Sequence, residues 1–421
     1  MLKDMNFIEI CTDILYFPFK SGMFDLQNIN SSMLITKILS TCYTTLNYTI
    51  KEYRPSELYA SQWLGLIMNQ ALATRDYNDI QAGRTLTELI DNNKRILESR
   101  IEPDTIKKFI EFLSIKDKDP KFVEILRAIV ICNGDPMIKN QKELSKLLLN
   151  NTKVKSELIF LLKKNMHSGE MLVNPKDIKY DGWVSLTAFG SMSHSLDNGK
   201  LYKYFMEMTE LLSGLCMDKA YIAIEELKDL YTYEYCSEIF LNEDYDKKLR
   251  KAFCNLLTNL WINIAPFKNM NLPEYIQIWN DLDKEPRICH SAEDTTNFIQ
   301  LKDYLTKYLM CAFEHEPAGD DGDNKESHDL SLSILELCDK MLQLGYFKTL
   351  DELNIMIRCM KKVSFDIFGY EKKLMAKNDG FALNKEELEN EAETLNECKI
   401  RVCQIFKYII AIQTDYQMKV F

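Results

Sequence analysis

The sequence predicts an all-α protein, because apolar residues recur at helical spacing along most of the chain. The helical patterns are separated by short turns, as in a stack of antiparallel helices. The 421 residues include only 14 glycines and 10 prolines, which argues against an all-β protein. We expect an armadillo-like helical solenoid in two units, with a possible small β element in the linker between them. The sequence has no sharp repeat of fixed period, so this prediction rests on helix density, and a helical bundle is the alternative.

Four apolar stripes carry the helical prediction, in chain order. Glu102-Pro103-Asp104 supplies the start of the first helix, and Asn133-Gly134-Asp135-Pro136 should stop the second. Glycine can adopt the left-handed conformation of a helix cap, and proline cannot continue a helix. We expect the stripe residues to form the core: Ile106, Phe109, Ile110 and Leu113; Phe122, Ile125, Leu126, Ile129 and Val130; Leu249, Phe253, Leu256, Leu257, Leu260 and Trp261; Phe298, Leu301, Leu305, Tyr308, Leu309 and Phe313.

Three segments interrupt the helical pattern. Residues 165–200 hold four of the glycines, and Trp183–Phe189 within them alternates like a short strand. Residues 314–329 read as an acidic, glycine-containing loop, and residues 376–385 as a polar loop before an acidic helix start. The sequence therefore predicts a first helical unit over residues 1–164, a linker over 165–200 and a second helical unit over 201–421.

Composition narrows the class of protein. A formal net charge of −11 repels phosphate backbones, so we expect no nucleic-acid partner. The N-terminal residues lack the pattern of a secretory signal, and no run approaches the ~18–20 apolar residues of a membrane helix. Twelve cysteines are scattered through apolar runs with no Cys-x-x-Cys spacing, which is typical of buried, reduced thiols. We therefore expect a cytoplasmic chain that makes no membrane contact of its own.

No motif in the sequence indicates catalysis. The five histidines share no metal-binding spacing, and the glycine patterns of nucleophile elbows, dinucleotide sites and phosphate loops are absent. The acidic run Asp320–Asn324 has its glycine out of register for a calcium-binding loop, so a solvated loop is favoured. We expect no cofactor, no metal site, no catalytic residue and no enzymatic activity.

One basic cluster has two interpretations. Lys51–Tyr59 lies at a predicted helix start, and Lys94 and Arg95 follow some turns later. The simpler interpretation is an N-terminal turn with surface charges. The functional one is an edge that contacts anions, since lysine, arginine and a tyrosine hydroxyl can together bind phosphate groups.

Several short runs resemble the family of inositol trisphosphate and ryanodine receptors, in order along nearly the whole chain. The Asn92-Asn93 pair before Lys94 and the run Lys118–Phe122 are closer to the inositol trisphosphate receptor branch. Ile131–Gly134 and Lys139–Gln141 are similar to both branches. Further similar runs are Leu86–Glu98, Leu215–Ile224, Asp246–Cys254, Tyr275–Trp279, Leu344–Phe347 and Lys399–Tyr416.

The resemblance implies a region of a larger channel. In that family a β-trefoil precedes these helices, the inositol phosphate binds between the trefoil and the helices, and a pore-forming region lies far downstream. We therefore expect a fragment or a truncated relative, with the trefoil and other channel parts as partners. The resemblance also implies a homotetrameric full-length protein at the cytosolic face of the endoplasmic reticulum.

The resemblance carries over three ligand-binding residues, Lys3, Tyr53 and Arg54. Where the family has Tyr-Arg-Lys, this chain has Tyr53-Arg54-Pro55, so one lysine contact is missing. We expect inositol trisphosphate to bind this chain weakly or not at all without the trefoil. The favoured function is a helical relay that transmits ligand-induced movement toward the pore. The alternative is a stand-alone helical-repeat adaptor that binds protein partners and no longer senses inositol phosphate.

Overall fold

A computed structural model of the chain describes residues 6–20, 33–51, 53–73, 80–115, 118–175, 182–191, 196–264, 298–313, 323–347, 349–378 and 385–420. The described residues are predominantly helical, and their strands form only a two-stranded and a three-stranded sheet. The prediction of an all-α helical solenoid with a small β element is therefore confirmed. The chain divides into two compact units, each of which we describe by itself.

Unit 1 comprises residues 1–161, 173–184 and 191–226. Its helical elements are α1 (Phe7–Lys20), α2 (Met33–Ile50), α3 (Arg54–Ala60), η3 (Ser61–Trp63), α4 (Leu64–Ala73), α5 (Ala82–Ile90), α6 (Lys94–Ser99), α7 (Pro103–Ile115), α8 (Pro120–Val130), α9 (Ile138–Leu148), α10 (Thr152–Leu158), α12 (Leu196–Cys216), η5 (Met217–Lys219) and α13 (Tyr221–Leu227). Strands β1 (Ile131–Cys132) and β2 (Asp135–Pro136) form a short antiparallel hairpin.

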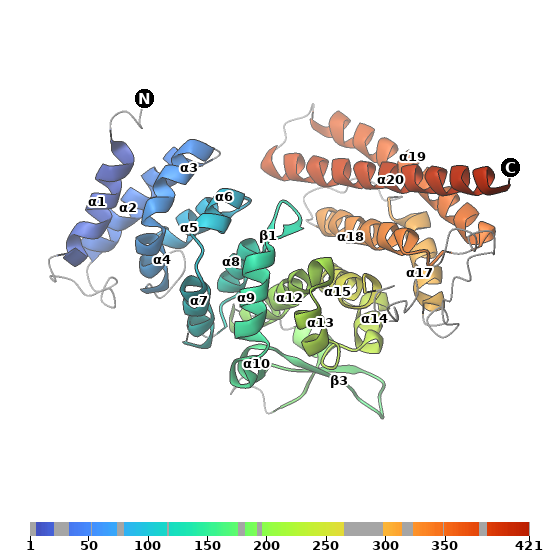
Figure 1. Cartoon of the computed structure of the whole chain (residues 1–421), viewed down its shortest axis with the longest axis horizontal. Coiled ribbons are helices and arrows are strands. Elements are labelled where there is room, and N and C mark those ends of the chain that lie inside the picture. The colour runs from blue at the N-terminus through green and yellow to red at the C-terminus, as the bar shows by residue number, and fades with distance from the viewer. Residues whose placement is uncertain are drawn as a thin grey trace, which may run out of the picture. The chain divides into compact units, whose positions relative to one another are not determined.

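Helix α8 is the centre of unit 1. It packs against α5, α7, α9 and α12, and α12 makes the most extensive of these contacts (Figure 1). Asp119 caps its start by accepting from the Lys121 N–H at 3.1 Å. The apolar stripes of α7 and α8 are buried, as predicted. The predicted second unit begins at residue 201, whereas α12 lies in unit 1 because it packs against α8 and α9.

The predicted helix stop after α8 is a hairpin turn. Asn133 and Gly134 have φ values of 51° and 80°, and strands β1 and β2 pair on either side of them. Positive φ at both central residues is the geometry of the two-residue turns that Asn-Gly favours. The helix itself already ends at Val130. The left-handed glycine was predicted, but it closes a hairpin and does not cap the helix.

Unit 2 comprises residues 162–172, 185–190 and 227–421. Its helical elements are α11 (Leu186–Ser191, which ends in unit 1), α14 (Tyr233–Leu241), α15 (Lys247–Leu257), the π-helical turn η6 (Thr258–Ile262), α17 (Ile299–Cys311), α18 (Asp323–Gln343), α19 (Leu350–Asn378) and α20 (Lys385–Val420). Helix α18 packs against α15 and α20, and α19 packs against α17 and α20 (Figure 1). Of the two predicted stripes, Trp261 and Tyr308 are half-buried and the other residues are buried.

The small β element is shorter than the alternation of Trp183–Phe189 suggests. Strands β3 (Leu161–Lys164), β4 (Met171–Asn174) and β5 (Val184–Ser185) form a sheet in that order, and α11 begins directly after β5. The Ser185 hydroxyl accepts from the Ala188 N–H at 3.4 Å, in the way of an N-cap. A serine before an apolar run therefore starts a helix here, where alternation alone predicted a longer strand.

The predicted acidic loop also ends earlier. Helix α18 begins at Asp323, so 323–329 is helical, while 314–322 lies outside the described residues. His328 is 3% exposed and stacks on Phe313 with ring centroids 5.6 Å apart. This segment is therefore packed against the protein, whereas the prediction was a solvated loop. Of the predicted polar loop, 376–378 belongs to α19 and Lys385 to α20, while 379–384 lies outside the described part of the chain.

Buried side-chain amides of unit 1 bond to backbone groups at the ends of its helices, and we call these contacts helix joints. The Asn140 amide donates to the carbonyls of Leu97 at 3.2 Å and Ile129 at 3.0 Å. The Gln141 amide donates to the carbonyls of Gly214 at 3.1 Å and Met217 at 3.0 Å, at the end of α12. The last carbonyls of a helix have no partner within the helix, so these amides satisfy groups that would otherwise be costly to bury.

We expect Gln141→Ala to lower the free energy of unfolding by about 2–3 kcal/mol, because it removes both hydrogen bonds at the end of α12. The matched control is Lys142→Ala, which changes the next, exposed residue of the same helix. Urea denaturation followed by circular dichroism measures both. Equal stabilities of the two variants would contradict this role of Gln141.

Burial also predicts which thiols react. Burial raises the pKa of the Cys11 thiol to about 11 and that of Cys398 to about 12, and it raises the pKa of Cys216 and Cys338 further. Since the thiolate is the nucleophile, these groups should resist alkylation in the native protein. We expect maleimide at pH 7.5 to label the exposed Cys311 and Cys403 and to spare Cys216 and Cys338, as mapped by peptide mass spectrometry. Rapid native labelling of Cys216 would refute this packing.

Candidate functional site

The candidate anion-contacting edge lies at the start of α3 in unit 1. Tyr53 is the residue before the helix, and its side chain makes no capping hydrogen bond. Pro55 occupies the first turn, where its fixed φ and missing N–H suit a helix start. Tyr53 is 55% exposed, so its hydroxyl is available to solvent. Lys3, the third predicted ligand residue, lies outside the described residues.

Arg54 is already engaged within the protein. Its guanidinium Nη1 donates to Glu57 Oε2 at 2.8 Å, and the side chains of Arg54 and Glu57 are 58% and 3% exposed. The same nitrogen lies 3.5 Å from the Asp91 carbonyl oxygen. An incoming anion must therefore share the Arg54 charge with a buried carboxylate, which weakens any new contact.

Glu57 joins two helix starts. The Asn93 amide donates to the same Glu57 oxygen at 2.7 Å, and Asn93 Oδ1 accepts from the Ile96 N–H at 3.4 Å, which caps α6. The carboxylate thus receives donors from both Arg54 and Asn93. Two donors satisfy a carboxylate that would be expensive to bury alone.

The β1–β2 hairpin borders the same edge. The Asn133 N–H donates to Asn92 Oδ1 at 2.8 Å, so the turn before α6 holds the hairpin. Burial raises the pKa of the Cys132 thiol, and the positive charges of Lys94 and Arg54 oppose that rise. Lys94 and Arg54 therefore both place positive charge near Cys132 at the hairpin. The edge combines exposed Lys94 and Arg54 with the exposed ring of Tyr53.

The sequence indicates the exposed residues of this edge but not the buried ones. Glu57 lies within the basic cluster Lys51–Tyr59, and no local pattern indicates that it is buried. Its position three residues after Arg54 indicates only that the two side chains share a helix face. Asn93 is part of the family-like pair Asn92-Asn93, and an asparagine directly before Lys94 also fits a helix N-cap.

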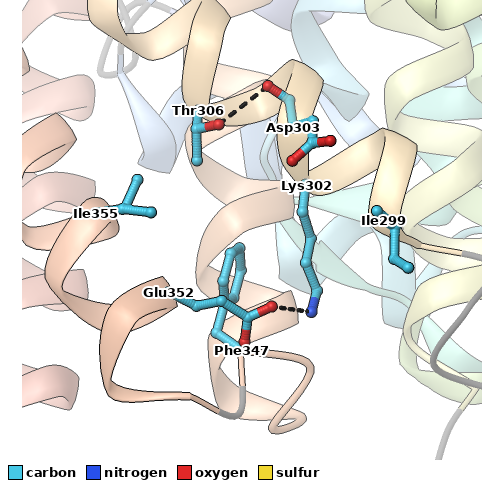
Figure 2. A pocket seen from close by; sticks show the side chains of 7 residues that line it. All are labelled: Ile299, Lys302, Asp303, Thr306, Phe347, Glu352 and Ile355. Carbon is cyan, nitrogen blue, oxygen red and sulfur yellow. Dashed lines mark hydrogen bonds and ion pairs between the residues drawn. The ribbon is translucent and has the colours of Figure 1, made fainter.

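A small pocket in unit 2 is a second candidate, but its charged residues are already paired with each other. It has a volume of about 100 Å³ and lies between α17 and α19 (Figure 2). Lys302 Nζ lies 2.7 Å from Glu352 Oε1 and 5.4 Å from the centre of the Phe347 ring. The lysine is thus already paired with a carboxylate and an aromatic face. This pocket offers little to a charged ligand.

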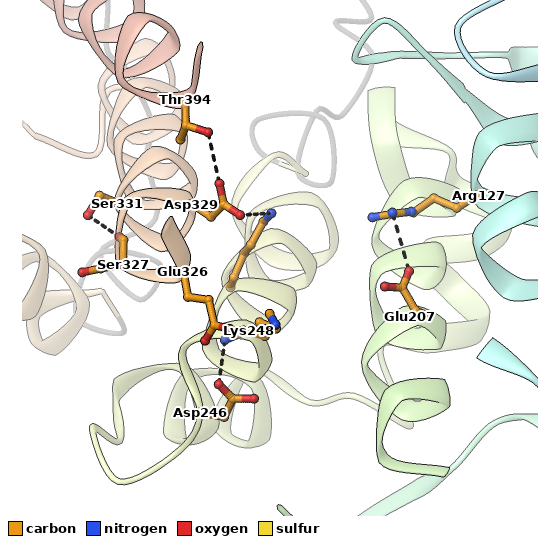
Figure 3. A network of polar contacts seen from close by, with 10 residues as sticks. Arg127, Glu207, Asp246, Lys248, Glu326, Ser327, Asp329, Ser331 and Thr394 are labelled. Carbon is orange, nitrogen blue, oxygen red and sulfur yellow. Dashed lines mark hydrogen bonds and ion pairs between the residues drawn. The ribbon is translucent and has the colours of Figure 1, made fainter. Parts of the chain in front are cut away.

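Polar contacts elsewhere connect helices. In unit 2 the ion pair of Lys248 with Glu326, at 2.7 Å, joins α15 to α18 (Figure 3). The Thr394 hydroxyl donates to Asp329 at 3.4 Å and joins α20 to α18 (Figure 3). In unit 1, Arg127 and Glu207 lie 3.6 Å apart and join α8 to α12. Over the described part of the chain, no group of three or more histidine, cysteine, aspartate or glutamate residues could hold a metal ion.

Residues 3–159 match the sequence profile of the RIH domain. The matched residues include α3, α6 and the hairpin of the candidate edge, and the match does not reach α12, the helix that packs most extensively on α8.

Two relatives extend the comparison. Over 259 residues the chain is 29% identical to "Inositol 1,4,5-trisphosphate receptor-like protein A" of Dictyostelium discoideum, and over 214 residues it is 25% identical to "Inositol 1,4,5-trisphosphate receptor itr-1" of Caenorhabditis elegans. The matches cover 60% and 49% of this chain and 7% of each relative. The resemblance to a region of the inositol trisphosphate receptor family is thereby confirmed. None of the described helices has the length and apolar character needed to cross a bilayer.

Substitution of Asn93 tests how the buried residues support the candidate edge. We expect Asn93→Ala to lower the free energy of unfolding by about 2–3 kcal/mol, because it removes the cap of α6 and a donor to the buried Glu57 carboxylate. Asn93→Asp keeps the capping oxygen but places a second carboxylate beside Glu57, so it should also destabilise the protein at pH 8. Thermal denaturation measures both variants. A wild-type melting temperature for Asn93→Asp would show that the contact with Glu57 is dispensable.

Proposed function

We propose that this chain is a helical relay within an inositol trisphosphate receptor-like calcium-release channel. The observation that carries the proposal is the match of residues 3–159 to the RIH-domain profile, together with the similarity to two proteins named as inositol trisphosphate receptors or receptor-like. The relay would transmit ligand-induced movement from a preceding β-trefoil toward a pore. It would act through binding surfaces and movement, without catalysis.

The helix joints support a relay mechanism. Several residues that carry the resemblance also fix helix ends: Asn93 caps α6, Asp119 caps α8, and Gln141 holds the end of α12. Side chains that lock helix ends make a packed block stiff, and a stiff block passes on a displacement by rigid-body movement. In this proposal the trefoil and other channel parts are the partners, the full-length protein is a homotetramer, and the chain works at the cytosolic face of the endoplasmic reticulum.

Inositol trisphosphate would bind this chain weakly or not at all without the trefoil. Pro55 stands where the family has a lysine, and Arg54 shares its charge with Glu57. Each missing charge-assisted contact costs about 1.5–3 kcal/mol. Of the three residues carried over by resemblance, Tyr53 and Arg54 lie on the described edge.

The same observations favour a second candidate. A stand-alone helical-repeat adaptor that no longer senses inositol phosphate would not need the family's lysine at the position of Pro55. It would retain the joints, because they stabilise the fold whatever its function. The two candidates differ in the size and the membrane association of the native protein that carries this region.

Cell fractionation separates the two candidates. We expect an antibody against this region to detect a carbonate-resistant membrane protein far larger than 49.3 kDa, because a channel needs a trefoil and membrane helices. A protein of the relay's own size that leaves the membrane with the carbonate wash would contradict the channel and favour the adaptor.

Ligand titration tests the edge itself. We expect isothermal titration calorimetry to give inositol trisphosphate at least ~100-fold weaker binding to this chain alone than to the same chain joined to its trefoil, since more than one charge-assisted contact is missing. In the joined protein, Arg54→Ala should weaken binding further, and the exposed control Lys153→Ala should not. Equal binding by Arg54→Ala and wild type would remove Arg54 from the site.

A further inference from the structure

We infer that a groove between α18 and α20 in unit 2 is a docking site for an acidic peptide segment of a partner protein. The groove has a volume of about 380 Å³ and is lined by Asp339, Lys340 and Gln343 of α18 and by Arg401, Gln404 and Lys407 of α20, among others. The two helices pack side by side, so they hold these side chains on one rigid scaffold (Figure 1).

The groove has donors that the protein does not use. Within the part of the chain that the structure describes, neither Lys340 nor Lys407 forms an ion pair. Gln404 uses its amide oxygen to accept from Arg401 Nη1 at 3.0 Å, which leaves its NH₂ group for a ligand. Two ammonium groups and an amide donor therefore face a common space, on a chain whose net charge is −11. Such a local excess of positive charge attracts carboxylates.

Arg401 is part of the groove wall, and its guanidinium is already paired within the protein. Its Nη2 donates to Glu336 Oε1 at 2.8 Å, and its Nη1 lies 3.3 Å from Asp339 Oδ2. The two carboxylates hold the guanidinium between α18 and α20. We therefore assign the ligand contacts to Lys340 and Lys407, and the positioning of the groove wall to Arg401.

Asp339 belongs to the wall of the groove and is held by the protein itself. It is 3% exposed, and its Oδ2 accepts from the Gln343 amide at 2.9 Å, whereas its Oδ1 has no hydrogen-bond partner among the described residues. Because Oδ1 is itself buried, a ligand in the groove does not reach it. The ligand contacts therefore belong to Lys340 and Lys407, whose ammonium groups favour the closely spaced carboxylates of an acidic peptide.

The dimensions of the groove also fit a peptide. The lining residues of α20 extend from Arg401 to Ala411, which corresponds to about 15 Å along a helix. That length matches four to five residues of an extended segment, at roughly 3.3 Å each. Lys407 and Gln404 are exposed, so such a segment could enter from solvent without unfolding the helices. An acidic run at this spacing could engage both lysines at once.

Fluorescence anisotropy tests the groove with the full 421-residue chain. The probe is a fluorescein-labelled hexaglutamate peptide, and the reference probe is a hexaglutamine peptide of the same length. We expect the acidic peptide to bind with an affinity that falls as salt rises, and the neutral peptide to bind at least ~10-fold more weakly. Equal binding of the two peptides would overturn the proposal.

Charge reversal then locates the site. Lys340→Glu with Lys407→Glu should weaken hexaglutamate binding at least ~10-fold, because two attractive contacts become repulsive. The matched control is Lys307→Glu with Lys361→Glu, which changes two exposed lysines of α17 and α19 by the same charge. An equal loss in both double variants would overturn the groove. If the reversed protein melts earlier than wild type, Lys340→Gln with Lys407→Gln replaces it, and unchanged binding by that variant would overturn the proposal.

Competition separates a peptide from a phosphate ligand. Unlabelled hexaglutamate should displace the probe at a lower concentration than tripolyphosphate, because an extended peptide can follow the length of the groove, about 15 Å along α20, whereas the shorter tripolyphosphate cannot. Displacement by tripolyphosphate at the lower concentration would overturn the assignment to a peptide. None of these outcomes depends on inositol phosphate or on a channel, so the test stands apart from the relay proposal.

Discussion

The architecture of unit 1 depends on buried side-chain amides that satisfy the ends of its helices. Asn140 serves the carbonyls of Leu97 and Ile129, Gln141 serves the end of α12, and Asn93 caps α6 while it donates to Glu57. Each short helix leaves unpaired N–H and C=O groups at its ends, so a fold built from many short helices must pair many such groups in its interior. Amide side chains can do this because they carry donors and an acceptor together.

These joints give the proposed relay its physical basis. A stack of helices held only by apolar contacts can slide, because such contacts are non-directional. Hydrogen bonds between one helix end and the side of another fix the register, so displacement at one edge moves the packed block together. The candidate edge around Arg54 is attached to this system through Glu57 and Asn93. A ligand that pulled Arg54 away from Glu57 would therefore act on the starts of α3 and α6.

The candidate site was predictable only in its exposed half. Tyr53 and Arg54 could be identified because they follow a family-like pattern at a helix start, and the structure leaves both side chains more than half exposed. Glu57 could not, since a glutamate on a short helix is ordinarily solvated and its burial needs donors from distant sequence. Asn93 lies 36 residues from Glu57, and no local pattern links two residues at that separation.

The sequence by itself determined the helical class, the buried stripes of α7 and α8 and the helix start at Pro103, because these follow from local periodicity and backbone preference. Only the tertiary structure decided that α12 packs on α8, that Asn133-Gly134 closes a hairpin, and that α18 and α20 form a groove lined in part by Asp339. The physical reason is that periodicity tells which face of a helix is buried, whereas its partner depends on contacts between residues far apart in the chain.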